Sequence, residues 1–292
     1  MTAAEILKKL GPSFEKAQAA GDLLFFPSTI AKHPESGIEN NGHDPFEPPY
    51  NTNLYIGDLQ DEDSKEDYAV LLNKYSVVPE HFLMVTKEFR SQASPLMPPD
   101  LVQTYLLLAA ARKARKNLFA FYNCGDNSGA SQAHKHYLAR SVKLENPDTP
   151  FALNLTYANH VYRFPDRFYT FTPEKLEVVL AQAFLALLDL IISTIRHDPD
   201  YPAGKPSYNV VITLEHMHLV PRRQEEHILE ETGDKLSVNA LAFAGMLLVK
   251  SERELEAVKT EGVGKILRAV GLESVHELQV AGTILNFLNT KM

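Results

Sequence analysis

Hydrophobic positions along the chain fall into short runs with the spacing of strands and longer runs with the spacing of helices. Runs rich in Val, Ile, Leu, Phe and Tyr, bounded by turn residues, predict strands. These runs are Asn53 to Ile56, Tyr68 to Asn73, Phe82 to Thr86, Leu118 to Asn123, Ala133 to Val142, Tyr208 to Thr213 and His216 to Val220. The strands cluster in groups with helices between them, which predicts an α+β fold with an antiparallel sheet.

Helix signals lie between and outside these groups of strands. Thr2 with Glu5 forms a capping-box pattern for a first helix, and Ser251 with Glu254 repeats the pattern near the other end of the chain. A further helix is predicted over Leu101 to Lys116. The segment from Pro27 to Pro49 is rich in Pro, Gly, Asn and His, and it predicts a loop that can cover a site.

The most apolar stretch, Leu176 to Ile195, is long enough to cross a bilayer. Polar residues interrupt it at Glu177, Gln182 and Asp189. Its largest apolar residues recur with the spacing that places them on one face of a helix. A helix that buries one face in the core of the protein is therefore favoured over a membrane span, with Thr172 as its cap.

Composition narrows the class of protein. The chain has 292 residues, 45% of them hydrophobic, and a formal net charge of −8, which argues against nucleic acid as a partner. One cysteine, Cys124, cannot form a disulfide within the chain, and the N-terminal residues lack the apolar stretch of a signal peptide. We expect a protein of the cytoplasm, with the nucleus as a second compartment. We expect no membrane partner. We further expect a single domain over 1–292, with an N-terminal part (1–170) and a C-terminal part (171–292).

The segment FYNCGDNSGASQAHKHYLAR, residues 121 to 140, carries the most informative chemistry. In a strand, His134 and His136 share one face, and the Gly/Ser turn from Gly125 to Ser131 precedes them. Backbone N–H groups and hydroxyls of such a turn can hold phosphate oxygens, and a neutral imidazole can attack phosphorus directly. The pattern favours phosphoryl or nucleotidyl transfer. Two half-buried strand histidines bonded to the backbone remain the alternative.

A second group of candidates lies in SYNVVITLEHMHLVPRR, residues 207 to 223. His216 and His218 share one face of a predicted strand, but a zinc site needs at least a third ligand, and no Cys cluster or HExxH motif is present. Polar residues lining a pocket are favoured over a metal site. Arg222 suits bidentate contact with phosphate, and Lys74, after an apolar run, is a further candidate for a phosphate contact.

Several stretches together resemble one enzyme family. They are DPFEPPY (44 to 50), LLNKYSVVPEHFLMVTKEFRSQ (71 to 92), FYNCGDNSGASQAHKH (121 to 136), SYNVVIT (207 to 213), VPR (220 to 222) and SVNALAFAGMLLVKS (237 to 251). The chain resembles the fungal-type diadenosine tetraphosphate phosphorylases, also called ATP adenylyltransferases, of the histidine-triad superfamily. The resemblance implies a histidine-triad-like domain with a split antiparallel sheet and flanking helices.

The resemblance also implies a reaction and roles for individual residues. His136 would take an adenylyl group from an adenine dinucleotide and pass it to inorganic phosphate, giving ATP and ADP, while His134 would orient the site. The polyphosphate would be bound by Ser128, Gly129, Ser131 and Gln132, with Asn123, Lys74 and Gln92 completing the site. No tightly bound cofactor is expected, and magnesium would arrive with the nucleotide.

The chain departs from the family pattern at three places. Leu138 stands where the family motif HxHxQ has glutamine, and only Lys32, followed by His33 and Pro34, resembles the family's KKP lysines. Where relatives carry a tryptophan-led strand before VPR, this chain has His216 and His218. Two further hypotheses therefore stay open: an enzyme of the same fold with a rebuilt pocket for a different phosphorylated or specialised small molecule, and a non-catalytic nucleotide sensor.

Overall fold

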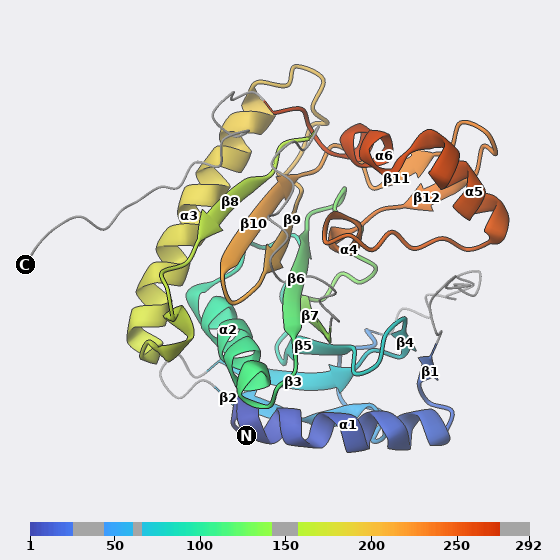
Figure 1. Cartoon of the computed structure of the whole chain (residues 1–292). Coiled ribbons are helices and arrows are strands. Elements are labelled where there is room, and N and C mark those ends of the chain that lie inside the picture. The colour runs from blue at the N-terminus through green and yellow to red at the C-terminus, as the bar shows by residue number, and fades with distance from the viewer. Residues whose placement is uncertain (26–43, 61–65, 142–156, 275–292) are drawn as a thin grey trace, which may run out of the picture.

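The fold is built on one eight-stranded antiparallel sheet. A computed structural model describes residues 1–25, 44–60, 66–141 and 157–274 (Figure 1). In spatial order the strands are β2 (Tyr55–Gln60), β3 (Asp67–Leu72), β5 (Phe82–Thr86), β7 (His136–Ser141), β6 (Leu118–Cys124), β9 (Tyr208–Ile212), β10 (His216–Pro221) and β8 (His160–Arg163). Every neighbouring pair is antiparallel, which confirms the predicted α+β class.

Three helices cover one face of this sheet: α1 (Ala3–Ala19), α2 (Pro98–Lys113) and α3 (Pro173–Arg196) (Figure 1). Their apolar side chains pack with alternate strand residues, such as Tyr137 and Met217, in one core. The predicted core helix is confirmed as α3, whose Leu180, Phe184 and Ile191 are buried. Burial of such large side chains supplies most of the free energy that holds a helix to a sheet.

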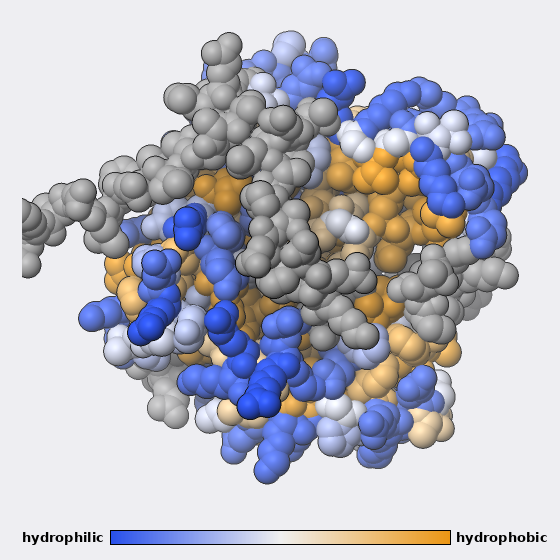
Figure 2. All heavy atoms as spheres, viewed as in Figure 1, coloured by the Kyte–Doolittle hydropathy of each residue, from blue (hydrophilic) through white to orange (hydrophobic). Residues whose placement is uncertain are grey.

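Smaller elements complete the described part of the chain. They are β1 (Leu24–Phe25), which pairs in parallel with β4 (Tyr75–Ser76), the 3-10 helix η1 (Phe168–Thr170), the hairpin of β11 (Glu226–Ile228) and β12 (Lys235–Ser237), and the helices α4 (Ala240–Phe243), α5 (Glu252–Glu261) and α6 (Val263–Val270). A second apolar cluster joins the hairpin to α5 and α6. In the view of Figure 2, hydrophobic residues are visible near the middle of the view and at its left edge, where α3 lies, among hydrophilic residues.

The opposite face of the sheet carries a separate apolar cluster. Phe121 and Val211 from neighbouring strands pack there with Leu241 of α4 and with Phe46. Phe46 lies in the segment 44–50, which has neither helix nor strand, as the composition predicted. The rest of that predicted loop, 27–43, lies outside the described residues, as does Lys32. Within the described part of this loop, Phe46 therefore packs against the sheet.

Most local helix signals are confirmed, and two boundaries differ. The capping box of Thr2 and Glu5 begins α1, and the Ser251 side chain accepts from the Glu254 N–H at the start of α5. The Glu254 carboxylate accepts from Lys250, one residue before the expected position. The helix predicted over Leu101 to Lys116 begins earlier, at Pro98, because proline suits the first helical positions, and it ends earlier, at Lys113.

The strand predicted over Ala133 to Val142 begins only at His136, so the prediction was wrong for His134. The chain just before β7 leaves the regular ladder. His134 pairs with Ser91 in an isolated bridge, and the Lys135 N–H donates to the Arg90 carbonyl. The segment 90–92 thus binds backbone groups of Ala133 and Lys135, although the Lys135 carbonyl still accepts from the Thr86 N–H of β5.

Candidate active site

His136 stands at the first position of β7 and is 3% exposed. Its Nδ1 lies 2.8 Å from the carbonyl oxygen of His134. Because a carbonyl oxygen only accepts, Nδ1 carries the hydrogen and Nε2 carries the lone pair. Burial lowers the pKa of His136 to about 4, so the ring is neutral at pH 7. The protein therefore presents an imidazole with a fixed tautomer and a basic Nε2.

His134 is anchored on both sides of its ring. Nδ1 lies 2.7 Å from Oδ2 of Asp44, and Nε2 lies 2.7 Å from the backbone oxygen of Thr86. The Thr86 hydroxyl oxygen also lies 3.1 Å from Nε2, so both ring nitrogens have polar partners within hydrogen-bond distance. The residue is 1% exposed, and its own carbonyl holds His136. His134 thus positions the His136 ring through its own backbone carbonyl. The partners of the His134 ring hold that side chain in place.

Phe46 packs against both imidazoles. Its ring centroid lies 6.0 Å from that of His134 and 5.1 Å from that of His136. The two histidines therefore share one face, as the alternation of the sequence predicted. Asp44 and Phe46 come from the same short segment, so it supplies both the acid that holds His134 and the ring that covers His136. Sequence reasoning assigned neither residue a role, although the segment belongs to the family-like stretch DPFEPPY.

Gln92 bridges the two strands at the point where their regular pairing ends. The last regular pair between β6 and β7 is Phe121 with Leu138. Beyond it, the Gln92 Oε1 accepts from the His136 N–H at 2.8 Å, and its Nε2 donates to the Asn123 carbonyl at 2.7 Å. The buried side-chain amide thus takes the place of a peptide group. It fixes the backbone of His136 against the end of β6.

Asn123 is buried and its side-chain oxygen is fully used. Oδ1 accepts from Asn209 Nδ2 at 2.8 Å and from the Ala240 N–H at 3.0 Å. Within the described part of the chain, its Nδ2 donates to no acceptor. Asn123 therefore joins β6, β9 and the start of α4, and it retains two N–H donors close to the backbone of His136.

The Gly/Ser turn between β6 and β7 is held from inside. The Ser128 hydroxyl donates to the Gly125 carbonyl at 2.6 Å, and the residue is 0% exposed. This corrects the expectation that its hydroxyl contacts a polyphosphate, because closing the turn commits the group. The following backbone N–H groups, from Gly129 to Gln132, donate to no acceptor among the described residues. Ser131 is exposed and Gln132 half-buried, so this part of the turn is accessible.

Gly129 is required by its conformation and by its surroundings. Its φ is +78°, and a Cβ atom there would lie 2.6 Å from the Val238 carbonyl oxygen. We expect Gly129→Ala to lower the free energy of unfolding by about 1 kcal/mol for the left-handed backbone and by about 1–3 kcal/mol more for the clash. Gly233 is the matched control, because its φ is +71° and no atom lies within 4 Å of the same Cβ. Urea denaturation measures both, and equal losses for the two variants would contradict the steric argument.

Arg222 is not available to a substrate, which corrects the expected phosphate contact. It is 0% exposed, and burial lowers its pKa to about 9. Its N–H groups donate to protein acceptors at Val270 O, Ser128 O, Asn209 Oδ1, Gln224 O and Val238 O. The guanidinium also lies over the ring of Phe243, 5.2 Å from its centroid. The role of Arg222 is to hold the Gly/Ser turn against the C-terminal part of the chain.

Lys135, between the two histidines, points to the helix-covered face. Its Nζ lies 2.7 Å from Asp100 Oδ2 and 2.8 Å from the Pro95 carbonyl oxygen, and the residue is 0% exposed. Asp100 is itself buried and also accepts from the Tyr68 hydroxyl at 2.8 Å. The histidine segment is thus anchored to the start of α2 by a buried ion pair. Nothing in the local pattern marked this lysine.

Two groups of predicted site residues lie apart from His136. Lys74 is exposed just beyond β3, at the opposite end of the sheet from His136, which pairs with Val85. His216 and His218 share a face, with ring centroids 5.9 Å apart, and burial lowers the pKa of His218 to about 3. They lie on the same face as His136. Because β6 and β9 intervene, they lie three strands away, at least about 14 Å from His136.

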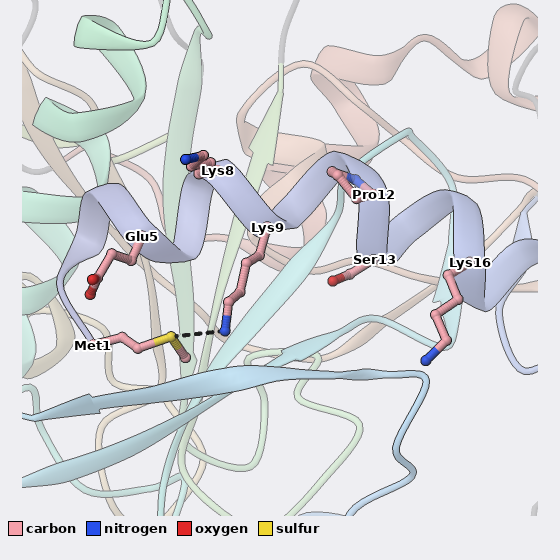
Figure 3. Close-up of a pocket in the computed structure, with 7 residues that line it drawn as sticks. All are labelled: Met1, Glu5, Lys8, Lys9, Pro12, Ser13 and Lys16. Carbon is pink, nitrogen blue, oxygen red and sulfur yellow. Dashed lines mark hydrogen bonds between the residues drawn. The ribbon is translucent and has the colours of Figure 1, made fainter.

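Two further features lie outside this site. An open pocket runs along α1, lined by Met1, Glu5, Lys8, Lys9, Pro12, Ser13 and Lys16 (Figure 3). Helix α1 covers the opposite face of the sheet from His136, so this pocket is separate from the histidines. Over the described ranges no group of three or more His, Cys, Asp or Glu side chains is arranged to hold a metal ion. The buried Cys124 has a pKa raised to about 11 by desolvation, as expected of a packed thiol.

The α+β fold has an antiparallel sheet that carries a histidine pair beside a Gly/Ser turn. This combination places the protein among the histidine-triad-like nucleotidyltransferases. Two family models match consecutive parts of the chain. The Ap4A phosphorylase N-terminal domain matches residues 28–156, and the ATP adenylyltransferase C-terminal domain matches residues 153–273. The chain belongs to the Ap4A phosphorylase family.

Relatives from Saccharomyces cerevisiae support this assignment. Diadenosine 5',5'''-P1,P4-tetraphosphate phosphorylase 2 is 28% identical over 261 residues, 79% of this chain and 77% of the relative. Protein APA1 is 29% identical over 268 residues, 84% of this chain and 81% of the relative. The crystal structure of yeast Ap4A phosphorylase Apa2 matches with a TM-score of 0.76 at 25% identity, covering 96% of this chain and 99% of that one. Its complex with Ap4A matches with a TM-score of 0.74 at 25% identity, covering 94% and 100%.

Proposed function

We propose that this protein cleaves diadenosine tetraphosphate by phosphorolysis, giving ATP and ADP, through an adenylyl group carried on His136. The observation that carries the proposal is the neutral His136 ring, whose Nδ1 is held by the His134 carbonyl so that Nε2 keeps its lone pair. The relatives named as Ap4A phosphorylases support the choice of substrate, and the solved complex of one of them with Ap4A supports it further.

The proposed reaction has two displacements at the same phosphorus atom. In the first, Nε2 of His136 attacks the phosphorus next to one adenosine, a P–N bond forms, the P–O bond to the rest of the chain breaks, and ATP leaves. In the second, an oxygen of inorganic phosphate attacks, the P–N bond breaks, and ADP leaves. ATP departs as an anion, so the first step needs no proton donor. Positioning of the nucleophile and the phosphate groups therefore accounts for most of the rate acceleration. Magnesium enters with the polyphosphate as part of the substrate.

The surrounding groups divide the work of positioning. The accessible N–H groups from Gly129 to Gln132 are proposed to bind phosphate oxygens, together with the Ser131 hydroxyl, since successive backbone N–H groups form a site for anions. The Asn123 amide is proposed to donate to the phosphoryl group on His136. Gln92 and His134 hold the nucleophile rather than the substrate, because their polar atoms bond to the backbone and to Asp44. Lys74 is proposed to meet only the far end of a long substrate.

The test is incubation with diadenosine tetraphosphate, magnesium and phosphate, followed by chromatography of the products. ATP and ADP in equal amounts are the expected result. ATP with AMP would show that water replaces phosphate and would overturn the phosphorolysis. If phosphate is left out and the α-phosphorus is labelled, the label should stay on the protein in an acid-labile bond. Tight binding with no product and no labelled protein would favour the nucleotide sensor.

Restoring the family glutamine tests how the departure at position 138 affects the rate. Leu138 pairs with Leu83 and Phe121 in the sheet, two residues along β7 from His136. One preorganised donor to a developing phosphoryl charge contributes about 3 kcal/mol, so Leu138→Gln is expected to raise kcat by about 100-fold. Leu138→Met, of similar size but without an amide, is the control. If glutamine performs no better than methionine, the pocket is not a weakened form of the family site.

One observation favours the rebuilt pocket as a second candidate. His216 and His218 share the sheet face of His136, and Asn159 Nδ2 lies 3.4 Å from His218 Nδ1. These residues are proposed to contact the part of the substrate remote from the reacting phosphorus. His218→Ala then raises KM and leaves kcat unchanged for diadenosine tetraphosphate. A product formed only from another phosphorylated compound, and lost with His218→Ala, would favour the rebuilt pocket over the family reaction.

A further inference from the structure

Helix α3 has a second face that the described part of the chain leaves uncovered, on which apolar side chains lie beside the exposed Gln182 and Asp189. Only 33% of its most apolar 18-residue window is buried, although the window is apolar enough to cross a membrane by length and composition. Val178 is 55% exposed and Leu185 is 63% exposed. Figure 1 shows α3 along the edge of the molecule with no other labelled element on its outer side. Large apolar side chains grouped on an open helix face mark an interaction surface.

Five residues of this outer face form a symmetric series, which we call the α3 stripe: Glu174, Val178, Leu185, Ile192 and Arg196. The steps between them are four, seven, seven and four residues. At about 100° per residue, these steps keep all five within an arc of about 40°. The stripe is therefore apolar in the middle, acidic at the start of the helix and basic at its end.

We propose that two copies of this chain pair through the α3 stripe, with the helices antiparallel and Leu185 on the two-fold axis. Residues equally distant from Leu185 then meet across the interface. Val178 faces Ile192 of the second copy, and Glu174 faces Arg196 of the second copy, twice. Among the described residues neither Glu174 nor Arg196 makes an ion pair within its own copy. A two-fold axis requires a patch that complements itself, and the stripe meets this requirement in both charge and hydrophobicity.

The size of the stripe sets the expected strength. The 24 residues of α3 span about 36 Å at about 1.5 Å per residue, and a face about 10 Å wide gives about 360 Å² on each copy. Stable interfaces bury about 800 Å² on each partner, so the pair should be reversible and depend on concentration. His136 points to the other face of the sheet, and both reaction sites stay open. Pairing can therefore fail without any change in the proposed reaction.

Sedimentation velocity over about 1–300 µM protein tests the proposal. The wild-type sedimentation coefficient should rise with concentration, and Leu185→Glu should stay monomeric because it places two carboxylates at the axis. Ile228→Glu is the matched control, since Ile228 is 61% exposed and lies on β11, away from the stripe. It should associate like the wild type. A wild type that is monomeric at every concentration overturns the proposal, and so does association that Leu185→Glu leaves intact.

The antiparallel register has its own test. Glu174→Arg and Arg196→Glu should each weaken association at least about 3-fold, and the double variant should recover it, because the charges are then exchanged on both copies. Leu185→Cys should form a disulfide-linked dimer on mild oxidation, since the axis places that residue opposite itself and Cys124 is buried. Ile228→Cys should not. Single and double charge variants that behave alike, or an unlinked Leu185→Cys, would overturn this register.

Discussion

Asparagine in place of His136 is expected to lower kcat by at least about 10⁴-fold, while the protein stays folded and binds substrate. Asparagine has no Nε2 lone pair, so the adenylyl group has no acceptor on the protein, and loss of a nucleophile commonly has an effect of this size. The measurement is release of ATP in a single turnover, together with counting labelled protein. His218→Ala is the control, because the proposed reaction leaves its kcat unchanged. Comparable loss in both variants would place the chemistry elsewhere in the pocket.

The same half-reaction should show an unusual pH profile. Burial lowers the pKa of His136 to about 4, whereas a free imidazole has a pKa of about 6.5. The reactive form is the neutral one, so activity is lost as protons bind to Nε2. The rate of ATP release should therefore stay constant from pH 8 down to about pH 5 and fall near pH 4. A decline centred near pH 6.5 would contradict a buried nucleophile.

Methionine in place of Lys135 is expected to lower the free energy of unfolding by about 3–5 kcal/mol. The Asp100 carboxylate would remain 1% exposed without its cation, and an uncompensated buried charge costs about this much. The measurement is urea denaturation followed by circular dichroism. Combining the change with Asp100→Asn should recover part of the loss, because the buried charge is then removed.

An exposed ion pair provides the control for Lys135. Lys259 and Glu256 lie 2.7 Å apart on α5 with side chains 60% and 66% exposed, and water screens the attraction in such exposed pairs. Lys259→Met should therefore leave the midpoint of the urea transition unchanged. If Lys135→Met has an equally small effect, water or a local rearrangement compensates Asp100, and the buried pair is not what anchors the histidine segment to α2.

Local patterns in the sequence determined the secondary structure and the kind of chemistry. Strand alternation placed His134 and His136 on one face, helical spacing identified the buried side of α3, and the glycines marked the turn before β7. Each of these features depends on neighbouring residues and on the backbone periods of 2 and 3.6, which are visible without any long-range contact. The family-like stretches added the expected reaction, because their residues occur together.

The tertiary structure alone decided which residues hold the nucleophile and which remain available to a substrate. Asp44 meets His134 across 90 residues, and Gln92 meets His136 across 44. The sequence suggested Arg222 for phosphate, but folding surrounds it with carbonyl groups that use its donors. Nothing in the sequence distinguishes Lys135 from other strand lysines, and its buried ion pair with Asp100 exists only in the folded chain. Such partners are set by how sheet and helices pack, and no local period encodes that packing, so only the folded chain shows them.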